Sequence, residues 1–517
     1  MKPYVFSIGG AFGELAASDP HQPALRLASG TITTYRELDD DANRLAAVFS
    51  SRGLRRRDVL GIVHTKTPLS YAAMLAALKL GAAYVNLDDQ NPPPRLAHIF
   101  ETARPAFIFA EHMPGTVRNV ATQLGAAVIE RNDIAAELHE APVEEPAQTR
   151  DVVGSDPAYI MYTSGSTGVP KGALMTHANV LNFARWAGAR FGIGPQDTLT
   201  NVNPMYFDNS VFDFYGGLLN GAAIAPIPRE TLADGVALVN AVEAAGCTIW
   251  FSVPSLLIYL TTLKLLHASR LPTIRTFAFG GEGYPKPELR KLFETFSSRA
   301  RIVNVYGPTE CTCICSAWDV RGSDLDDMNG LVTLGPLADN FFGLVLDGNE
   351  PVGPGEVGEL CLLGPQVGLG YVNDAQRTAD AFVQNPLNAR FAERMYRTGD
   401  LVKLGGDGRM LDFVGRKDNQ IKHMGYRIEL EEIEAAINQL KGVSQSAVLQ
   451  REGRRGQRLL VAYVASEIET NEATVRNALA ELLPPYMIPQ RVVVREALPK
   501  NANGKVDRIA LRAEELE

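Results

Sequence analysis

The positions of apolar residues along the chain predict alternating helices and buried strands between residues 30 and 400. The run 71–81 has the length and composition of a buried helix ending at a glycine, and a short strand is expected directly after it, at 82–85. A second apolar run, 158–162, has the length of a buried strand. This alternation is typical of parallel sheets covered by helices and predicts an α/β fold.

The pattern changes after about residue 320. Short strands separated by glycine and proline turns predict a small β-barrel-like subdomain that extends to about residue 400. The apolar pattern of about the last 100 residues predicts a separate α+β unit. It contains strands at 446–449 and 459–464 and a helix ending near residue 483. The chain is long enough for three to four such structural units.

The C-terminal unit is expected to begin with an amphipathic helix. Apolar residues at helical spacing form one face, namely Leu430, Ile433, Ile437 and Leu440. Acidic residues fall off that face, namely Glu429, Glu431, Glu432 and Glu434. We interpret these acids as a solvated face that also favours the helix N-terminus.

Composition narrows the function classes. The 517 residues carry a net charge of −9, with 46% apolar and 21% charged residues, which is ordinary for a globular protein and argues against a generic nucleic-acid or anionic-membrane binder. No apolar run approaches the ~18–20 residues of a membrane span, and no convincing cleavage site follows the N-terminus, so we expect a cytoplasmic protein.

Five cysteines exclude a complete intrachain disulfide framework. Cys311, Cys313 and Cys315 alternate along a strand-like run and would share one face. Their spacing does not match the paired Cys-x₂-Cys arrangement that zinc prefers, so packed or pocket-lining thiols are expected.

The run 162–172 is rich in glycine and small hydroxyl residues and contains Lys171. Glycines allow backbone N–H groups to approach phosphate oxygens, hydroxyls donate further hydrogen bonds, and lysine supplies positive charge. The spacing differs from that of the P-loop, because proline precedes the lysine and glycine follows it. Taken alone, the run is also compatible with a flexible linker.

Four further motifs follow downstream. In 304–310 a Gly-Pro turn leaves Tyr306 as a flat face for a base and Glu310 as an oxygen ligand for Mg²⁺. The motif 396–400 offers the Asp400 carboxylate to ribose hydroxyls. The others are 415–434, which is rich in charged residues, and 498–507, which places Lys505 on a turn.

In this order and at these intervals, the motifs resemble the acyl-adenylate-forming superfamily. Within it, the chain is similar to the amino-acid adenylation domains of nonribosomal peptide synthetases and to D-alanine–carrier protein ligases. The resemblance extends from Thr34 to Lys505. It implies an N-terminal adenylation core at 1–417, with two parallel-sheet subdomains and the β-barrel subdomain, and a mobile α+β lid domain at 418–517.

The resemblance also implies roles in binding ATP and Mg²⁺. Lys171, Glu310 and Thr163 would take part in catalysis, with Glu310 on Mg²⁺, Thr309 on the α-phosphate, Tyr306 and Asn304 on adenine, and Asp400 with Arg416 on ribose. The full set of residues expected to contact ATP or AMP is Thr163, Ser164, Gly165, Ser166, Thr167, Gly168, Lys171, Gly281, Asn304, Tyr306, Gly307, Thr309, Asp400 and Arg416.

Three C-terminal residues acquire roles in the same way. Lys505 would be the catalytic lysine that bridges the substrate carboxylate and the attacked phosphate; without the other motifs it would be a solvated surface lysine. Asp418 would be the hinge, although a static linker is the alternative. After rotation of the lid, Gly425 would line a tunnel for a phosphopantetheine thiol.

The residues that match the family's substrate pocket predict the acid that is activated. Asp208 takes the position that pairs with a substrate ammonium, and the uncharged remainder predicts a neutral amino acid. Strict alternation along a strand would admit only one of the adjacent Cys313 and Ile314. Gly280 stands where D-alanine ligases carry cysteine, which suggests room for a larger side chain. The pocket residues are Phe207, Asp208, Asn209, Phe212, Ser252, Ala278, Gly280, Val305, Cys313 and Ile314.

The expected function is ATP-dependent formation of an aminoacyl-AMP and transfer to a carrier protein. Because no carrier sequence follows Lys505 before the chain ends at Glu517, the carrier is expected to be a separate protein with a phosphopantetheine arm. One module cut from a larger synthetase would have the same sequence. A ligase that uses coenzyme A is the alternative enzyme, and a nucleotide-binding protein with a dead site is the non-enzymatic one. The sequence departs from the family pattern at Asn86, Leu369 and the pair His423-Met424.

Overall fold

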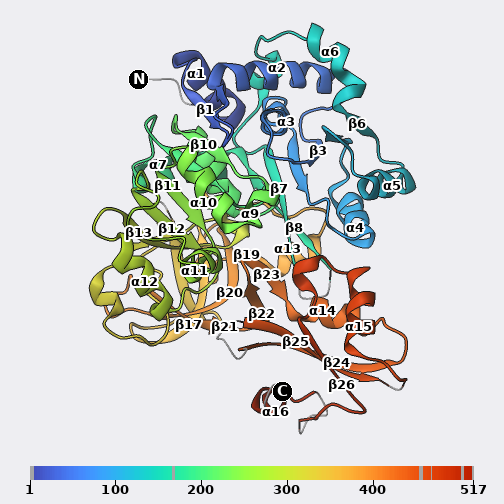
Figure 1. The fold of residues 1–517 in the computed structure, drawn as a ribbon, viewed down its shortest axis with the longest axis vertical. Coiled ribbons are helices and arrows are strands. Elements are labelled where there is room, and N and C mark those ends of the chain that lie inside the picture. The colour runs from blue at the N-terminus through green and yellow to red at the C-terminus, as the bar shows by residue number, and fades with distance from the viewer. Residues whose placement is uncertain are drawn as a thin grey trace.

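A computed structural model describes residues 5–165, 169–339, 341–452, 458–466, 468–501 and 506–514. Figure 1 shows a large N-terminal part, from blue to light orange, above a smaller C-terminal domain in orange and red. The small C-terminal domain agrees with the expected organisation of the chain. Within the described ranges, no helix combines the length and apolar character needed to cross a membrane.

Of the described strands, seven form one sheet in the order β18-β8-β7-β4-β3-β5-β6. Its central pairings, from β7 to β6, are parallel, whereas β8 and β18 are antiparallel additions at one edge. The strands are β3 (Val59–Val63), β4 (Ala83–Leu87), β5 (Phe107–Ala110), β6 (Val128–Glu130), β7 (Pro157–Thr163), β8 (Lys171–Thr176) and β18 (Gly370–Tyr371).

A second sheet contains eight described strands in the order β14-β13-β12-β11-β9-β10-β1-β2. The run from β13 to β1 is parallel, and β14 and β2 pair antiparallel at the two edges. The strands are β1 (Pro23–Arg26), β2 (Ile32–Thr34), β9 (Thr198–Asn201), β10 (Ala223–Pro226), β11 (Ile249–Ser252), β12 (Thr276–Gly280), β13 (Arg301–Tyr306) and β14 (Ser316–Asp319).

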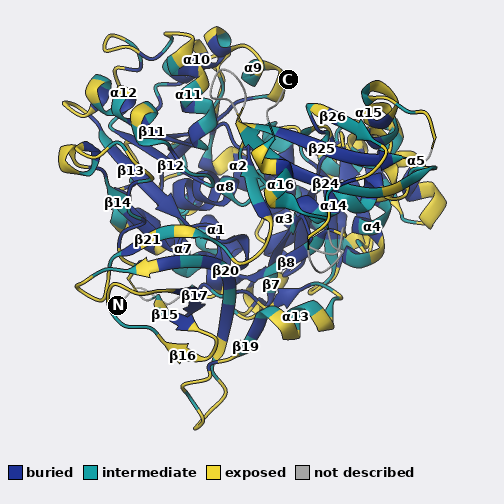
Figure 2. Ribbon diagram, turned by 90° about the horizontal axis from the view of Figure 1, so that it is seen from below, coloured by how far each residue is buried: buried dark blue, intermediate teal, exposed yellow. Residues whose placement is uncertain are grey.

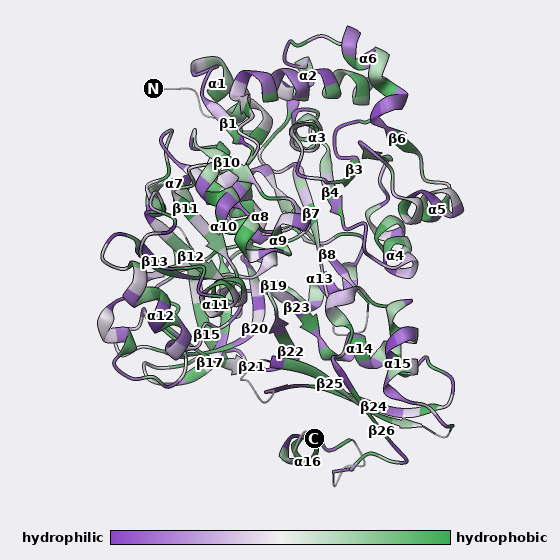
Figure 3. Ribbon diagram, in the orientation of Figure 1, coloured by the Kyte–Doolittle hydropathy of each residue, from purple (hydrophilic) through white to green (hydrophobic). Residues whose placement is uncertain are grey.

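Helices cover both sheets and are apolar toward them (Figures 2 and 3). Helix α3 is buried around nearly its whole circumference, because it packs between strands β3 and β4 of the first sheet and helices α1 and α2. The N-terminal helices are α1 (Ile8–Ser18), α2 (Tyr35–Ser51), α3 (Pro68–Lys79), α4 (Pro93–Ala103), α5 (Gly115–Leu124), α6 (Ala135–Glu140), α7 (His177–Phe191), α8 (Asn209–Val211), α9 (Arg229–Leu232), α10 (Gly235–Ala244), α11 (Pro254–Thr262), α12 (Lys286–Phe296) and α13 (Ala375–Ala381).

Six described strands form an antiparallel third sheet, which is curled and which corresponds to the expected small β subdomain. Its long central strand, β20, bends at a register shift near Leu401 and places Asp400 beside Arg416 of β21. The strands are β15 (Phe342–Asp347), β16 (Glu350–Pro351), β17 (Val357–Leu363), β19 (Phe382–Gln384), β20 (Arg394–Leu404) and β21 (Leu411–Arg416).

The C-terminal domain contains a hairpin, a small sheet and three α-helices among its described residues. The sheet is β24-β25-β26, and its apolar face packs against α14 and α15 around Ile433 and Ile437. The elements are β22 (Gln420–His423), β23 (Tyr426–Glu429), α14 (Leu430–Ile437), β24 (Val443–Glu452), β25 (Arg458–Ser466), α15 (Glu472–Ala480), β26 (Arg491–Arg495) and α16 (Arg508–Ala513).

Most of the expected elements are confirmed. The helix expected over 71–81 is α3, which is followed by Gly81 at φ +70° and by β4. The strand expected at 158–162 is β7, and the amphipathic helix after residue 429 is α14. Parallel sheets joined by covering helices therefore confirm the α/β prediction.

Two local predictions are wrong. The segment around Cys313 is not a strand, because Thr309–Cys311 is a 3-10 helix and Thr312 and Cys313 have φ of +60° and +75°. Alternation therefore does not govern which side chains face the pocket. The acids near α14 do not form a solvated face either, since Glu429 and Glu432 are 2% and 3% exposed.

Candidate functional site

The residues of the expected site converge where β11, β12 and β13 end and where β7 leads into the glycine-rich loop. A cavity of about 630 Å³ lies here between the N-terminal sheets and the C-terminal domain. Its walls include Asn304 and Tyr306 from β13, Asp400 and Arg416 from the curled sheet, and Lys422 from β22. The carboxyl ends of parallel strands are the usual place for a binding site in such folds.

The nucleoside half of the site consists of Asn304, Tyr306, Asp400 and Arg416. The Tyr306 hydroxyl donates to Asp400 Oδ2, and Arg416 Nη1 donates to Asp400 Oδ1 at 2.5 Å. Asn304 Nδ2 donates to the carbonyl oxygen of Thr333 at 2.9 Å. Burial raises the pKa of Tyr306, and the neighbouring Asp400 raises it further, so the hydroxyl stays protonated and remains a donor.

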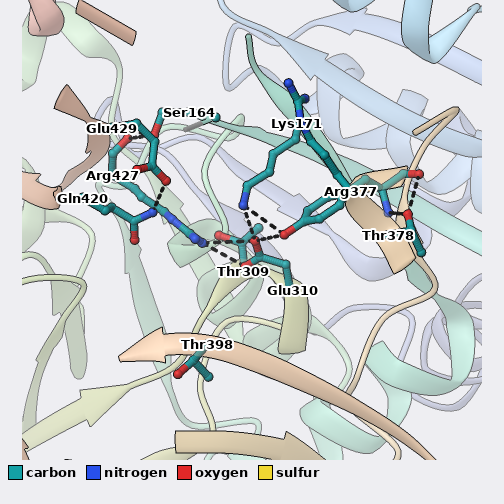
Figure 4. Close-up of polar contacts among 12 residues, drawn as sticks. Ser164, Lys171, Thr309, Glu310, Arg377, Thr378, Thr398, Gln420, Arg427 and Glu429 are labelled. Carbon is teal, nitrogen blue, oxygen red and sulfur yellow. Dashed lines mark hydrogen bonds and ion pairs between the residues drawn. The ribbon is translucent and has the colours of Figure 1, made fainter. Parts of the chain in front are cut away.

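The phosphate half of the site consists of Ser164, Gly165, Lys171 and Glu310, and Figure 4 shows Ser164, Lys171 and Glu310. Glu310 is fully buried at the short 3-10 helix, and Lys171 Nζ from β8 lies 3.5 Å from its Oε1. The Tyr371 hydroxyl lies within hydrogen-bonding distance of both, at 3.0 Å from Lys171 Nζ and 2.8 Å from Glu310 Oε1. The arrangement brings one partly buried cation and one fully buried anion to the mouth of the glycine-rich loop.

Arg427 of β23 extends from the C-terminal domain into the phosphate half (Figure 4). Its Nη1 lies 2.9 Å from Glu310 Oε2 and 3.2 Å from Oε1. Burial by itself would raise the pKa of Glu310, but Arg427 and Lys171 outweigh it and hold that pKa below its ordinary value. Burial lowers the pKa of Lys171, and the charge of Arg427 adds to this shift.

The glycine-rich loop also contacts the C-terminal domain. Ser164 Oγ donates to the carbonyl oxygen of Arg427 at 2.7 Å and accepts from the backbone N–H of Glu429 at 3.2 Å. The backbone N–H of Gly165 donates to Glu432 Oε2 at 3.4 Å. The Glu432 carboxylate therefore accepts the hydrogen bond of a loop N–H that could otherwise donate to a phosphate oxygen.

Glu432 has a second partner, because Arg95 Nη1 of α4 forms an ion pair with its Oε1 at 2.5 Å. Both side chains are almost fully buried, at 7% and 3% exposed. These contacts explain why Glu432 is buried rather than solvated. A periodic pattern shows which face of a helix is apolar, but it does not show that another domain covers the polar face. We call this set of contacts between 420–432 and the N-terminal part the docked arrangement.

Four of the expected site residues lie outside the described residues, namely Ser166, Thr167, Gly168 and Lys505. Thr163, just before the loop, has a buried Oγ1 with no hydrogen-bond partner among the described residues. Gly281 has φ +89° and lines the cavity. Gly307 lies so close to the following turn that a Cβ would be 2.2 Å from the carbonyl oxygen of Cys313.

The expected substrate residues gather next to the phosphate half. Asp208 Oδ2 accepts from Thr309 Oγ1 at 2.7 Å, so the hydroxyl expected on the α-phosphate here binds the pocket carboxylate instead. Burial raises the pKa of Asp208, while the Thr309 hydrogen bond opposes the shift. Among the described residues Asp208 forms no ion pair.

The remaining pocket residues line the adjoining strand ends and helix. The ring of Phe212 packs against Phe251 at 5.0 Å, and Ser252 Oγ is engaged by Trp250 Nε1 at 2.8 Å. Asn209 lies beside Gly281, at 3.5 Å from the place where a Cβ would be. Ala278, Val305, Cys313 and Ile314 are all buried.

Gly280 does not give the extra room that the sequence suggested. A Cβ at this position would lie 2.5 Å from the carbonyl oxygen of Val305 and 2.6 Å from its Cγ2, in the paired strand β13. The glycine therefore permits a close approach of two strands, and a larger substrate side chain cannot be inferred from it.

Two expected C-terminal positions are adjacent to the cavity. Asp418 accepts bidentately from Arg416, at 2.6 and 2.7 Å, directly after β21. Gly425 has φ +84°, a Cβ there would lie 2.6 Å from Val253 Cγ1, and its N–H donates to Glu282 Oε2 at 3.3 Å. Only glycine fits this left-handed position against the N-terminal surface.

Sequence reasoning gave no role to four residues that the structure places at the site: Tyr371, Lys422, Arg427 and Glu432. Lys422 Nζ lies 5.9 Å from the centre of the Tyr306 ring. The charged motif 415–434 contains Lys422, Arg427 and Glu432. Its high density of charged residues was the sequence feature that could have indicated their role. Tyr371 gave no such signal, because its strand joins β8 from 200 residues away.

Comparison with known proteins agrees with this geometry. Residues 12–372 match the family described as AMP-binding enzyme, and residues 432–505 match the AMP-binding enzyme C-terminal domain. The chain belongs to the AMP-binding enzyme family. It is an adenylate-forming enzyme of the nonribosomal-peptide-synthetase adenylation type, for which ATP is the nucleotide.

This AMP-binding enzyme is 35% identical over 512 residues to a dimodular nonribosomal peptide synthase of Bacillus subtilis (strain 168), covering 98% of the chain and 21% of the relative. It is 30% identical over 506 residues to tyrocidine synthase 1 of Brevibacillus parabrevis, covering 98% and 45%. The chain thus spans less than half the length of these relatives.

Among solved structures, the AMP-binding enzyme is similar to holo-PA1221, described as a nonribosomal peptide synthetase protein containing adenylation and PCP domains. The TM-score is 0.84 at 28% identity, covering 99% of this chain and 85% of that one. IdnL1 has a TM-score of 0.78 at 29% identity, covering 96% and 100%. The o-succinylbenzoate CoA synthetase of Bacillus subtilis, at 21% identity and a TM-score of 0.83, shares the fold.

Proposed function

We propose that this chain activates a neutral amino acid with ATP and then transfers it to the phosphopantetheine thiol of a separate carrier protein. The observation that carries the amino-acid assignment is Asp208, a carboxylate at the start of α8 whose described partner is the neutral hydroxyl of Thr309. Burial of an unpaired carboxylate is costly, and a substrate ammonium would supply the missing cation. The uncharged neighbours of Asp208 favour a neutral side chain.

In the first step, an oxygen of the amino-acid carboxylate attacks the α-phosphorus of ATP. A new bond between that oxygen and the α-phosphorus forms while the bond to the pyrophosphate oxygen breaks, which leaves aminoacyl-AMP and pyrophosphate. The nucleoside half would orient the nucleotide through Asn304 and Tyr306 on adenine and Asp400 with Arg416 on ribose. Such positioning supplies much of the rate of a phosphoryl-type transfer.

The phosphate half would neutralise the charge that accumulates on the departing pyrophosphate. Lys171 and the loop residues 163–168 would hold the β- and γ-phosphates, and Lys505 would bridge the substrate carboxylate and the α-phosphate. Glu310 and the orphan hydroxyl of Thr163 fit a hard cation, because both are buried oxygen donors. A bound Mg²⁺ would supply positive charge to the phosphates there.

The second step is the attack of the carrier thiol on the acyl carbonyl, which forms the thioester and releases AMP. The docked arrangement supports a state suited to this step, because Arg427 and Glu432 occupy the contacts that a metal-bound triphosphate would need. Gly425 lies against Val253 at the domain interface, where the resemblance puts the thiol tunnel. Asp418 lies at the proposed boundary between 1–417 and 418–517. Rotation of the C-terminal domain about this hinge would convert the docked arrangement into one that brings Lys505 to the nucleotide.

Similarity to proteins with adenylation and PCP domains supports a carrier protein as acceptor. The likeness to tyrocidine and surfactin synthases supports a role in nonribosomal peptide or other secondary-metabolite biosynthesis. The five cysteines are free in the described structure, which is in keeping with the reducing cytoplasm that we propose as its location.

The test is ATP–pyrophosphate exchange across a panel of amino acids, with aryl and fatty acids as controls. We expect exchange with one or a few neutral amino acids. Asp208→Ala should reduce the preference for the amino acid over its des-amino analogue by about 10-fold or more. An unchanged preference, or exchange only with acids that lack an amino group, contradicts the assignment.

The acceptor is tested separately by supplying a phosphopantetheinylated carrier protein or coenzyme A to the charged enzyme. Thioester on the carrier is the expected result. Thioester on coenzyme A alone identifies the chain as an acyl-CoA ligase instead. Exchange with no acid at all, from folded protein, would revive the non-enzymatic alternative.

A further inference from the structure

Lys171 and Glu310 form an ion pair in a largely buried site, but the contact between them is long. Their nearest atoms, Nζ and Oε1, are 3.5 Å apart, whereas charge-assisted hydrogen bonds are usually about 2.7–2.9 Å. Two unit charges at this distance in a low-dielectric interior attract strongly. A third group that binds both would stabilise this spacing and leave both charges available for phosphate and metal.

The Tyr371 hydroxyl is placed to do this. It donates to Glu310 Oε1 at 2.8 Å and accepts from Lys171 Nζ at 3.0 Å. A phenol has one O–H donor and can also accept, so a single hydroxyl satisfies both charged groups. Lys171 Nζ also lies 4.7 Å from the centre of the Tyr371 ring, which adds a cation–π contact.

The backbone of Tyr371 is fixed by its own supports. Strand β18 pairs with β8, with Tyr371 opposite Ala173, two residues from Lys171. The Tyr371 N–H donates to Thr378 Oγ1 at 2.9 Å, and the ring packs edge-on against Phe382 at 5.5 Å. Figure 4 shows Thr378 to one side of the Lys171–Glu310 cluster, where α13 approaches it. The hydroxyl is thus held on a rigid support rather than on a loop.

The contacts among Lys171, Glu310 and Tyr371 do not depend on the position of the C-terminal domain, whereas the Arg427 contact does. Lys171, Glu310 and Tyr371 all belong to elements of the N-terminal part, on β8, the short 3-10 helix and β18. Their mutual contacts therefore persist if the C-terminal domain moves and removes Arg427. Tyr371 would then be the remaining donor to Glu310 when a metal-bound triphosphate enters.

We propose that Tyr371 is a positioning residue for nucleotide activation, which sets the spacing of Lys171 and Glu310 so that both can bind the metal-bound triphosphate. This inference rests on the proposed function for the identity of the nucleotide. It assigns to the β18 tyrosine a role that the sequence motifs did not indicate.

The decisive variant is Tyr371→Phe, which keeps the ring contacts to Lys171 and Phe382 and removes only the hydroxyl. We expect the Kd for Mg²⁺·α,β-methylene-ATP, measured by calorimetry without amino acid, to rise about 10-fold. The difference between variant and parent should shrink when EDTA replaces Mg²⁺. In exchange assays, the KM for Mg·ATP should rise while the KM for the amino acid stays within about twofold.

Tyr84→Phe is the matched control, because Tyr84 is equally buried and its hydroxyl pairs with that of Tyr215 at 2.8 Å, outside the site. An unchanged Kd in Tyr371→Phe, or an equal rise in Tyr84→Phe, overturns the proposal. So does an equal loss of thiol transfer from supplied aminoacyl-AMP, because that step needs neither the β- and γ-phosphates nor the metal. Since calorimetry uses no amino acid or carrier, a failure of the substrate assignment would not affect this test.

Discussion

The nucleoside half and the phosphate half of the site are completed by different parts of the chain. In the nucleoside half, Asp400 binds both Tyr306 and Arg416, and all three belong to the N-terminal sheets. The C-terminal domain adds Lys422, whose Nζ lies 5.9 Å from the centre of the Tyr306 ring. In the phosphate half, Glu310 and Gly165 have partners from the C-terminal domain, Arg427 and Glu432. The first half is thus prearranged, whereas the second is blocked for a metal-bound triphosphate in the docked arrangement.

This difference between the two halves explains how one site can serve two reactions. A nucleoside that stays in place through both steps needs a fixed binding surface. The β- and γ-phosphates are present only before pyrophosphate leaves, so their binding groups can be reused by the docked domain afterwards. Variants that affect one half and spare the other therefore test whether the two halves serve different steps.

The largest effect is expected from Lys505→Ala, since this lysine would act only in adenylation. ATP–pyrophosphate exchange should fall about 100- to 1,000-fold, because a cation at the attacked phosphate is lost. Thiol transfer from supplied aminoacyl-AMP should stay within about threefold of the parent. Equal loss of both steps would show that the two reactions share one domain arrangement.

Arg427→Gln should have the opposite pattern. Removing Arg427 leaves Glu310 without its cation from the docked domain, which should lower thiol transfer about 10- to 100-fold. Exchange should change by no more than about threefold, because Mg²⁺ would take over the charge of Glu310 in that state. Rates are compared in single-turnover assays of each step.

The control for this variant is Arg508→Gln. Arg508 pairs with Glu434 at 2.6 Å within the C-terminal domain and contacts neither half of the site. It should leave the ratio of the two rates unchanged. If Arg427→Gln and Arg508→Gln changed the ratio of the two rates equally, the Arg427 contact would only stabilise the C-terminal domain.

A smaller effect is expected in the nucleoside half. Tyr306→Phe removes the hydroxyl that donates to Asp400, but Asp400 keeps its ion pair with Arg416. The KM for ATP should rise about 3- to 10-fold in exchange assays, with the same ranking of amino acids as in the parent. A change in amino-acid preference would place Tyr306 in the substrate pocket instead.

The sequence predicted the first half better than the second. Strand β13 and the position of Tyr306 follow from an apolar run that ends at a Gly-Pro turn, and Asp400 lies in a short local motif at 396–400. The burial of Glu429 and Glu432, however, depends on a partner domain, and the roles of Arg427 and Tyr371 depend on contacts across 117 and 200 residues. Periodicity carries no information about such contacts.

Two errors have the same origin. Cys313 was expected on a strand but lies in a left-handed turn, and Gly280 was expected to open the pocket but faces the backbone of Val305. At Cys313 two consecutive left-handed residues interrupt the expected strand, and at Gly280 the paired strand β13 fills the space beside the glycine. Residue types alone could not distinguish these alternatives.

The smallest effect should come from pH. Because Arg427 and Lys171 hold the pKa of Glu310 below its ordinary value of about 4.3, the carboxylate stays ionised from pH 8 down to 5.5. A depressed carboxyl pKa contributes stability above the unfolded pKa and loses it only as pH falls through the folded pKa. The docked fraction should therefore vary by less than about twofold across this range, and a transition centred near pH 6 would point to another group.

The most direct measurement is the distance between spin labels on the two parts of the chain, with and without Mg²⁺·α,β-methylene-ATP. Gln123 on α5 and Gln439 after α14 are exposed, and the native cysteines are buried, so introduced cysteines at these positions can be labelled selectively. We predict that the saturating nucleotide shifts the distance distribution away from that of the docked arrangement, whereas AMP does not. An unchanged distribution with the metal-bound triphosphate would contradict the claim that it and the C-terminal domain compete for the phosphate half.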